Sequence, residues 1–77
     1  MAVDVTIPTD LWDGDEQAVI TTWLAADGAR VGEGVLIAEI MVEKIQHEMR
    51  ASVSGALAIV KQVDDIVSKG DVIATIG

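Results

Sequence analysis

The stretch VGEGVLIAEI, from Val31 to Ile40, recurs in a weaker form as VSKGDVIATI, from Val67 to Ile76. Gly34 of the first copy aligns with Gly70 of the second, so the copies are offset by 70 − 34 = 36 residues. The same alignment pairs Val31 with Val67, Ile37 with Ile73, Ala38 with Ala74 and Ile40 with Ile76. A repeat of this kind within 77 residues predicts two similar half-sheets packed together.

The composition around the repeat favours β-structure. Apolar residues make up 51% of the chain, mostly Val, Ile and Ala, with no Phe or Tyr. β-branched side chains favour strands over helices, and turn-prone residues recur at intervals of roughly 8–12 residues without a helical period. We therefore expect an all-β sandwich or barrel, in one domain of this length.

Alternating apolar residues and turn signals place the expected strands. They are Val3–Ile7, Ala18–Leu24, a short strand at Val31, Leu36–Met41, Ile45–Arg50, Ala56–Val63, a short strand at Val67, and Val72–Ile76. The segment Thr9–Glu16 is polar apart from two residues and contains the turn-prone pair Asp13-Gly14, which indicates a surface loop. Trp23 lies within an expected strand, and we expect it to pack in the core.

Lys44 lies in the turn Val42-Glu43-Lys44-Ile45, between the two copies of the repeat. A shift of 36 residues from Lys44 gives position 8 or position 80, so we expect this turn and the chain termini at opposite ends of the domain. Neither Glu43 nor Lys44 is Gly or Asn, and we therefore expect a type I turn rather than a primed type.

Charge and composition exclude several classes of function. The net charge is −8, with thirteen acidic and five basic residues, whereas nucleic-acid binding needs clustered Lys and Arg; we expect no nucleic-acid partner. The longest apolar run, Ala56–Val60, is far short of the roughly 20 residues of a membrane span, and no signal-peptide pattern opens the chain. We expect no membrane association. The chain has no cysteine, and its single histidine, His47, lacks both a metal partner and a nucleophile, so we expect no metal site and no catalytic residue.

The segment GVLIAEIMVEKIQHEMRASVSG, Gly34–Gly55, resembles the lipoyl domain of 2-oxo acid dehydrogenase complexes. It is similar to that family's strand, acid-lysine turn and return strand ending in small residues. The likeness continues through Trp23-Leu24, Asp27-Gly28, Val31, Val67, Gly70 and Ile73-Ala74. The resemblance implies one lipoyl domain over residues 1–77, a flattened barrel-sandwich of two four-stranded antiparallel sheets with quasi-two-fold symmetry.

The resemblance also implies a function for the turn. Lys44 would carry lipoate through an amide bond, with Glu43 beside it as a mark for the attaching enzyme and Val42 and Ile45 as the flanking residues. The domain would contribute no catalytic group, because the cofactor performs the acyl and redox chemistry on a swinging arm. Leu11 and Trp12 lie in the loop that, in this family, helps the decarboxylase choose its carrier; they either have that role or fold back over the core.

The partners implied are those of an acyltransferase component. They are a lipoate ligase or lipoyltransferase, a thiamine-dependent 2-oxo acid decarboxylase, the acyltransferase core and dihydrolipoamide dehydrogenase. The expected location is the cytoplasm of a bacterium or archaeon, preferred over the mitochondrial matrix.

Three positions depart from the lipoyl pattern, and two alternatives remain open. Met41 lies where many lipoyl domains have an acid, Ile45 replaces a frequent Ala, and Ser52 replaces a frequent Pro. A biotin carboxyl carrier domain shares the fold, and the segment 47–51 is similar to its return strand, but its lysine is typically flanked by methionines. The other alternative is an unmodified lipoyl-like binding module.

Overall fold

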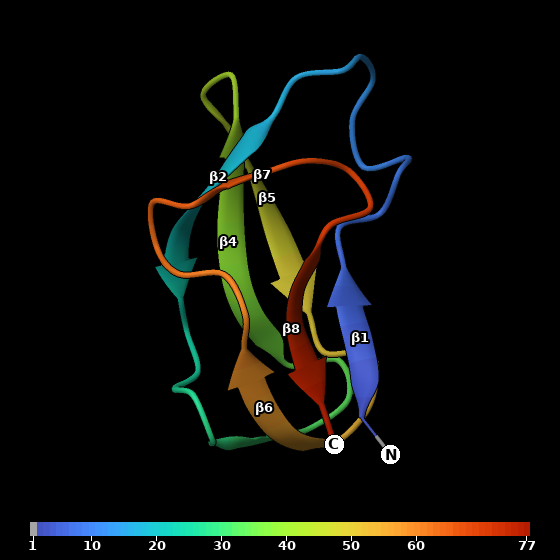
Figure 1. Cartoon of the computed structure of the whole chain (residues 1–77), viewed down its shortest axis with the longest axis vertical. Helices are drawn as coiled ribbons and strands as arrows, with labels where there is room; N and C mark the ends of the chain where they lie inside the picture. The colour runs from blue at the N-terminus through green and yellow to red at the C-terminus, as the bar shows by residue number, and fades with distance from the viewer. Residues whose placement is uncertain (1) are drawn as a thin grey trace.

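The computed structural model describes residues 2–77, which form eight β-strands and contain no helix. The strands are β1 (Val3–Thr6), β2 (Ala18–Trp23), β3 (Arg30–Val31), β4 (Leu36–Val42), β5 (Ile45–Arg50), β6 (Gly55–Ile59), β7 (Ile66–Val67) and β8 (Val72–Ile76). They make two four-stranded antiparallel sheets, ordered β1-β8-β6-β3 and β5-β4-β2-β7 (Figure 1). The expected all-β fold of two four-stranded sheets is confirmed.

The two sheets are related by the repeat. Exchanging β1 with β5, β8 with β4, β6 with β2 and β3 with β7 converts one strand order into the other. The aligned glycines have nearly the same backbone, with φ of 84° at Gly34 and 87° at Gly70. Their amides donate equivalent hydrogen bonds of 2.8 Å, from Gly34 to the Ala51 carbonyl and from Gly70 to the Ile7 carbonyl. The repeat therefore encodes the same turn and strand twice.

The core lies between the sheets and is entirely apolar. Ile37, Ala38 and Ile40 are fully buried, and so are their counterparts one repeat later, which are Ile73, Ala74 and Ile76. No polar or charged residue is buried among residues 2–77. Any chemistry at a side chain of this part of the protein must therefore take place at its surface.

The prediction of a strand over Ala56–Val63 is wrong in its second half, because β6 ends at Ile59. The amides of Val60 and Lys61 both donate to the carbonyl of Ile73, at 2.9 and 3.0 Å. Two residues facing one is the arrangement of a β-bulge, which interrupts the ladder. The β-branched residues that suggested a longer strand, Val60 and Val63, are about half exposed instead.

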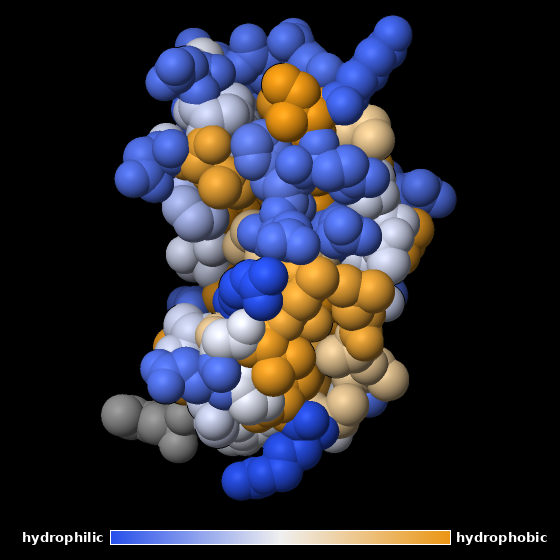
Figure 2. Space-filling view, turned by 180° about the vertical axis from the view of Figure 1, so that it is seen from behind, coloured by the Kyte–Doolittle hydropathy of each residue, from blue (hydrophilic) through white to orange (hydrophobic). Residues whose placement is uncertain are grey.

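The turn that contains Lys44 and the chain termini lie at opposite ends of the molecule, as expected (Figure 1). The molecule is elongated, with extents of 32 × 19 × 18 Å, and the termini meet where Gly77 packs against Ala2. Figure 2 shows hydrophobic surface gathered over the half that carries the termini, and mostly hydrophilic surface over the other half. The end that presents Lys44 is therefore the polar end of the face seen there.

A pair of equivalent turns gives a test of the repeat. Gly28 (φ 85°) and Asp64 (φ 75°) both have left-handed backbones, and their amides donate to the carbonyls of Leu57 and Ile20. A Cβ at Gly28 would meet no atom within 4 Å, so Gly28→Ala should lower the free energy of unfolding by about 1 kcal/mol through backbone strain alone. Asp64→Gly should raise it by about 0.5 kcal/mol, since it relieves that strain at a cost in chain entropy. Chemical denaturation measures both; a loss of stability in Asp64→Gly would contradict the prediction.

Candidate functional site

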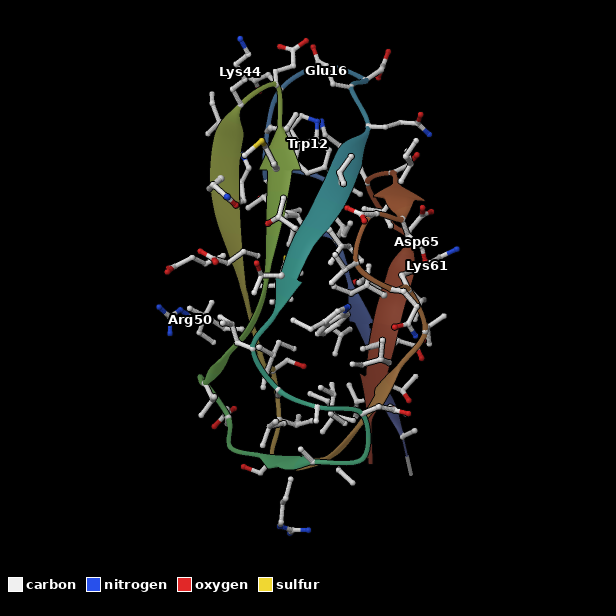
Figure 3. The ribbon with its side chains drawn as sticks, turned by 90° about the vertical axis from the view of Figure 1, so that its left-hand side faces the viewer. Trp12, Glu16, Lys44, Arg50, Lys61 and Asp65 are labelled. Carbon is white, nitrogen blue, oxygen red and sulfur yellow. The ribbon has the colours of Figure 1, made fainter. Side chains whose placement is uncertain are left out.

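Lys44 occupies the tip of a tight hairpin. Strands β4 and β5 pair as far as Val42 and Ile45, which leaves only Glu43 and Lys44 to connect them. Both residues are exposed, and Lys44 points away from the body of the molecule (Figure 3). The ion pair found among residues 2–77 joins Arg50 to Glu48, at 3.2 Å, and does not involve Lys44. The amine of Lys44 is therefore presented to solvent without a competing carboxylate.

The turn is of a primed type, so the expectation of a type I turn was wrong. The φ angles are positive at both central residues, 47° at Glu43 and 71° at Lys44, as in a type I′ turn. A two-residue hairpin needs this geometry because only the primed turns match the right-handed twist of the paired strands. The left-handed backbone costs about 1–2 kcal/mol per residue, and the long β4–β5 ladder holds it in place.

The two residues that flank the turn have different environments. Val42 is 5% exposed and belongs to the core, so its side chain fastens the base of the turn to the body of the protein. Ile45 is 62% exposed, although it directly faces Val42 across the hairpin. The hairpin thus extends beyond the core on its β5 side, and an apolar side chain stands in solvent beside Lys44.

Trp12 lies beside this hairpin and is held from several sides. Its Nε1 donates a hydrogen bond of 3.1 Å to the carbonyl of Glu16. The centroid of its ring is 5.9 Å from that of His47 on β5. The Nζ atom of Lys69 lies 5.3 Å from the centroid of the Trp12 ring, within the range of a cation–π interaction. The contact with His47 attaches the loop to the strand that leaves the Lys44 turn.

The rest of the loop is fastened to the segment that precedes β8. Lys69 Nζ donates to the carbonyl of Gly14 at 2.7 Å, and Gln17 Nε2 donates to Ser68 Oγ at 3.0 Å. Leu11, like Trp12, is half-buried and packs against the core. Both residues therefore fold back over the core, while the exposed parts of their side chains remain available for contact. Trp23 is also half-buried on the core, with Nε1 donating to the carbonyl of Lys61 at 2.9 Å.

A shallow hollow of about 180 Å³ lies between the loop and the hairpin. Its lining residues are Trp12, Asp13, Glu16, Val42, Glu43, Ile45 and His47. The hollow brings together the expected residues Trp12, Val42, Glu43 and Ile45 at the base of the Lys44 turn. A larger hollow, of about 250 Å³, runs between the ends of β1 and β5 and includes Leu11 but no residue of the turn.

The sequence did not single out Glu16 or Lys69 as parts of this region. The Oε2 atom of Glu16 is buried and has no hydrogen-bond partner among the described residues, and Lys69 holds the loop from 55 residues away. Nothing local in the sequence signals either contact. Across residues 2–77 there is no cluster of three or more side chains that could bind a metal, and that part of the chain has no helix long and apolar enough to cross a membrane.

Comparison with known proteins gives one family. A family model described as biotin-requiring enzyme matches residues 5–76, which include both copies of the repeat and the turn between them. No curated protein matches the chain significantly.

Proposed function

Because this chain belongs to the biotin/lipoyl attachment family, whose domains carry lipoate or biotin covalently on a lysine, we propose that Lys44 is the attachment residue and that lipoate is the attached group. Domains of this family are generally carriers without catalytic activity of their own.

The position of Lys44 is the observation that supports this assignment most. Of the three lysines, Lys44 alone is exposed at a hairpin tip, and its turn lies at the end of the molecule opposite the termini (Figure 1). Lys69 is engaged with Gly14 and Trp12, and Lys61 is half-buried in the loop after β6. A lysine at an exposed hairpin tip can enter the active site of another enzyme without interference from its own domain.

The residues at the tip fit an amide-linked group. The amine of Lys44 is outside the ion pair recorded for residues 2–77, and Glu43 and the exposed Ile45 flank it in a turn of defined backbone. Lipoate rather than biotin is favoured by these flanking residues, because the biotin family typically has methionine on both sides. When attached, lipoate would supply the acyl-carrying and redox chemistry, and the side chain of Lys44 would hold it away from the body of the domain.

The wider role that we propose is that of residues 1–77 as the lipoyl domain of a 2-oxo acid dehydrogenase acyltransferase component, in the cytoplasm. Its partners would be a lipoate ligase or lipoyltransferase, a thiamine-dependent decarboxylase, the acyltransferase core and dihydrolipoamide dehydrogenase. The contact of Trp12 with His47 on β5 supports a part for Leu11 and Trp12 in decarboxylase recognition, because it fixes their loop beside the hairpin.

Co-expression with a lipoate ligase, and separately with a biotin ligase, tests the assignment. We expect intact-mass spectrometry to show the mass of one lipoyl group in the first case, mapped to Lys44 by peptide sequencing, and the unmodified chain in the second. The two added masses differ, so the readout is unambiguous. Biotin on Lys44 would instead establish a biotin carrier, and an unmodified chain with both enzymes would indicate a binding module.

A further inference from the structure

A row of apolar side chains crosses the outer face of the sheet next to the Lys44 turn. Val19 of β2 is paired with Met41 of β4 on one side and with Ile66 of β7 on the other. Ile66 is 62% exposed, and Met41 and Val19 are partly exposed. We call these three residues the apolar row. In Figure 3 the upper parts of the green, teal and orange strands that carry them lie side by side near the Lys44 end.

The apolar row faces solvent because of strand alternation. Its neighbours one position along the strands, Val42, Ala18 and Val67, are all buried in the core. Successive side chains of a strand point to opposite faces of the sheet, so the row points outward. Val42 is also the last residue before the turn, so only the pair Val42 and Ile45 separates the row from the turn that contains Lys44. An outward apolar strip three strands wide is not needed to fill the core of this domain.

Carboxylates surround the apolar row. On the same outward face, the next residues along β4 and β5 are Glu39 and Glu48, which face each other. Glu43 lies in the turn above, and the exposed pair Asp64 and Asp65 immediately precedes Ile66. An apolar centre with a charged rim is the general pattern of a recognition surface. Arg50 pairs with Glu48, but the carboxylates of Glu39, Glu43, Asp64 and Asp65 lie outside that ion pair. The rim is therefore negative on balance and complements a partner surface rich in Lys and Arg.

We propose that the apolar row is the docking surface for the enzyme that attaches the cofactor to Lys44, and that the enzyme's docking face has an apolar side chain ringed by Lys and Arg. This inference rests on the proposed function. Any enzyme that acylates the amine of Lys44 must cover the tip of the hairpin, and the outer face of the sheet beside the tip then lies within its reach. A second copy of this chain is disfavoured as the occupant, because both net charge (−8) and rim are negative.

Met41 gives the row its continuity from β2 to the hairpin. An acidic residue at this position would place a charge next to Val19 and confine the apolar surface to β2 and β7. Methionine is flexible and polarisable and is enriched at interfaces, so it can adapt to an apolar side chain of a partner. The departure of Met41 from the lipoyl pattern therefore marks a docking preference of this chain.

The test measures the initial rate of lipoate attachment to the full 77-residue chain, with a lipoate ligase, as a function of chain concentration. Ile66→Ser should raise KM about 10-fold without changing kcat, the effect of losing an interface contact worth about 1.4 kcal/mol. Val35→Ser is the matched control, because Val35 is a similarly exposed apolar residue (47%) just before β4, at the end of the sheet away from Lys44. Higher ionic strength should raise KM for the unsubstituted chain, since it screens the acidic rim.

Each outcome has a distinct meaning. An unchanged KM in Ile66→Ser, an equal rise in both variants, or a lower KM in Met41→Glu would overturn the docking surface while leaving the proposed function intact. Attachment of biotin alone would overturn the lipoate assignment, and the same comparison would then be made with the biotin ligase. Attachment by neither enzyme would overturn both.

Dimerisation of the native chain in sedimentation, abolished by Ile66→Ser, would show instead that the row joins two copies of this chain. Thermal unfolding of each variant verifies that it is folded.

Discussion

Lys44→Arg should yield a folded protein to which no cofactor is attached. Arginine keeps the positive charge and the length of the side chain, and Lys44 is exposed, so the hairpin loses no packing. The guanidinium does not take the place of the ε-amine in amide formation. We expect intact mass after co-expression with the lipoate ligase to fall from the modified value to that of the bare chain, and the thermal unfolding midpoint to remain unchanged.

A residue swap tests whether the position of the lysine matters as well as its presence. The double variant Glu43→Lys, Lys44→Glu keeps the composition and charge of the turn but moves the amine by one residue. In a type I′ turn the two central side chains leave the backbone in different directions, so the moved amine should not be acylated. Full modification of this variant would show that any exposed lysine near the tip is sufficient, and modification of Lys44→Arg would place the site at Lys61 or Lys69.

The sheet architecture was predictable because the two copies of the sequence repeat form equivalent turns and strands in the two sheets. Gly34 and Gly70 close equivalent turns, and the buried positions that follow them are occupied by the same residue types in both halves. Local sequence thus determined where strands start and which side chains face inward. The exposed lysine turn followed from the same logic, since the repeat places it opposite the termini.

The turn type and the surroundings of Trp12 were not predictable in the same way. Residue preferences at Glu43 and Lys44 favour a type I turn, but the twist of the whole β4–β5 ladder decides the backbone, and twist is not a local property. Trp12 is positioned by His47 and Lys69, which are distant in sequence. Whether its loop folded over the core therefore depended on contacts that no local pattern records.

Ile37→Ala and Ile73→Ala should each lower the free energy of unfolding by about 3–4 kcal/mol. Both side chains are fully buried at equivalent places of the two sheets, and truncating a buried isoleucine removes its transfer energy and leaves a cavity. A domain of 77 residues has a total stability of roughly 4–12 kcal/mol, and this one has no disulfide to support it. Each substitution should therefore remove a large share of the stability. The variant with the lower free energy of unfolding should be partly unfolded at 37 °C.

The comparison with Ile45→Ala makes the cause specific. Ile45 is 62% exposed, so the same truncation there should change stability by less than about 0.5 kcal/mol. Urea denaturation followed by tryptophan fluorescence, from Trp12 and Trp23, which both pack against the core, measures all three variants. Equal losses of unfolding free energy at Ile37 and Ile73 would mean that equivalent positions of the two sheets contribute equally to stability as well as sharing the same geometry. A small loss at one of them would mean that the halves share a topology but not a stability, because one sheet could then relax into the cavity while the other could not.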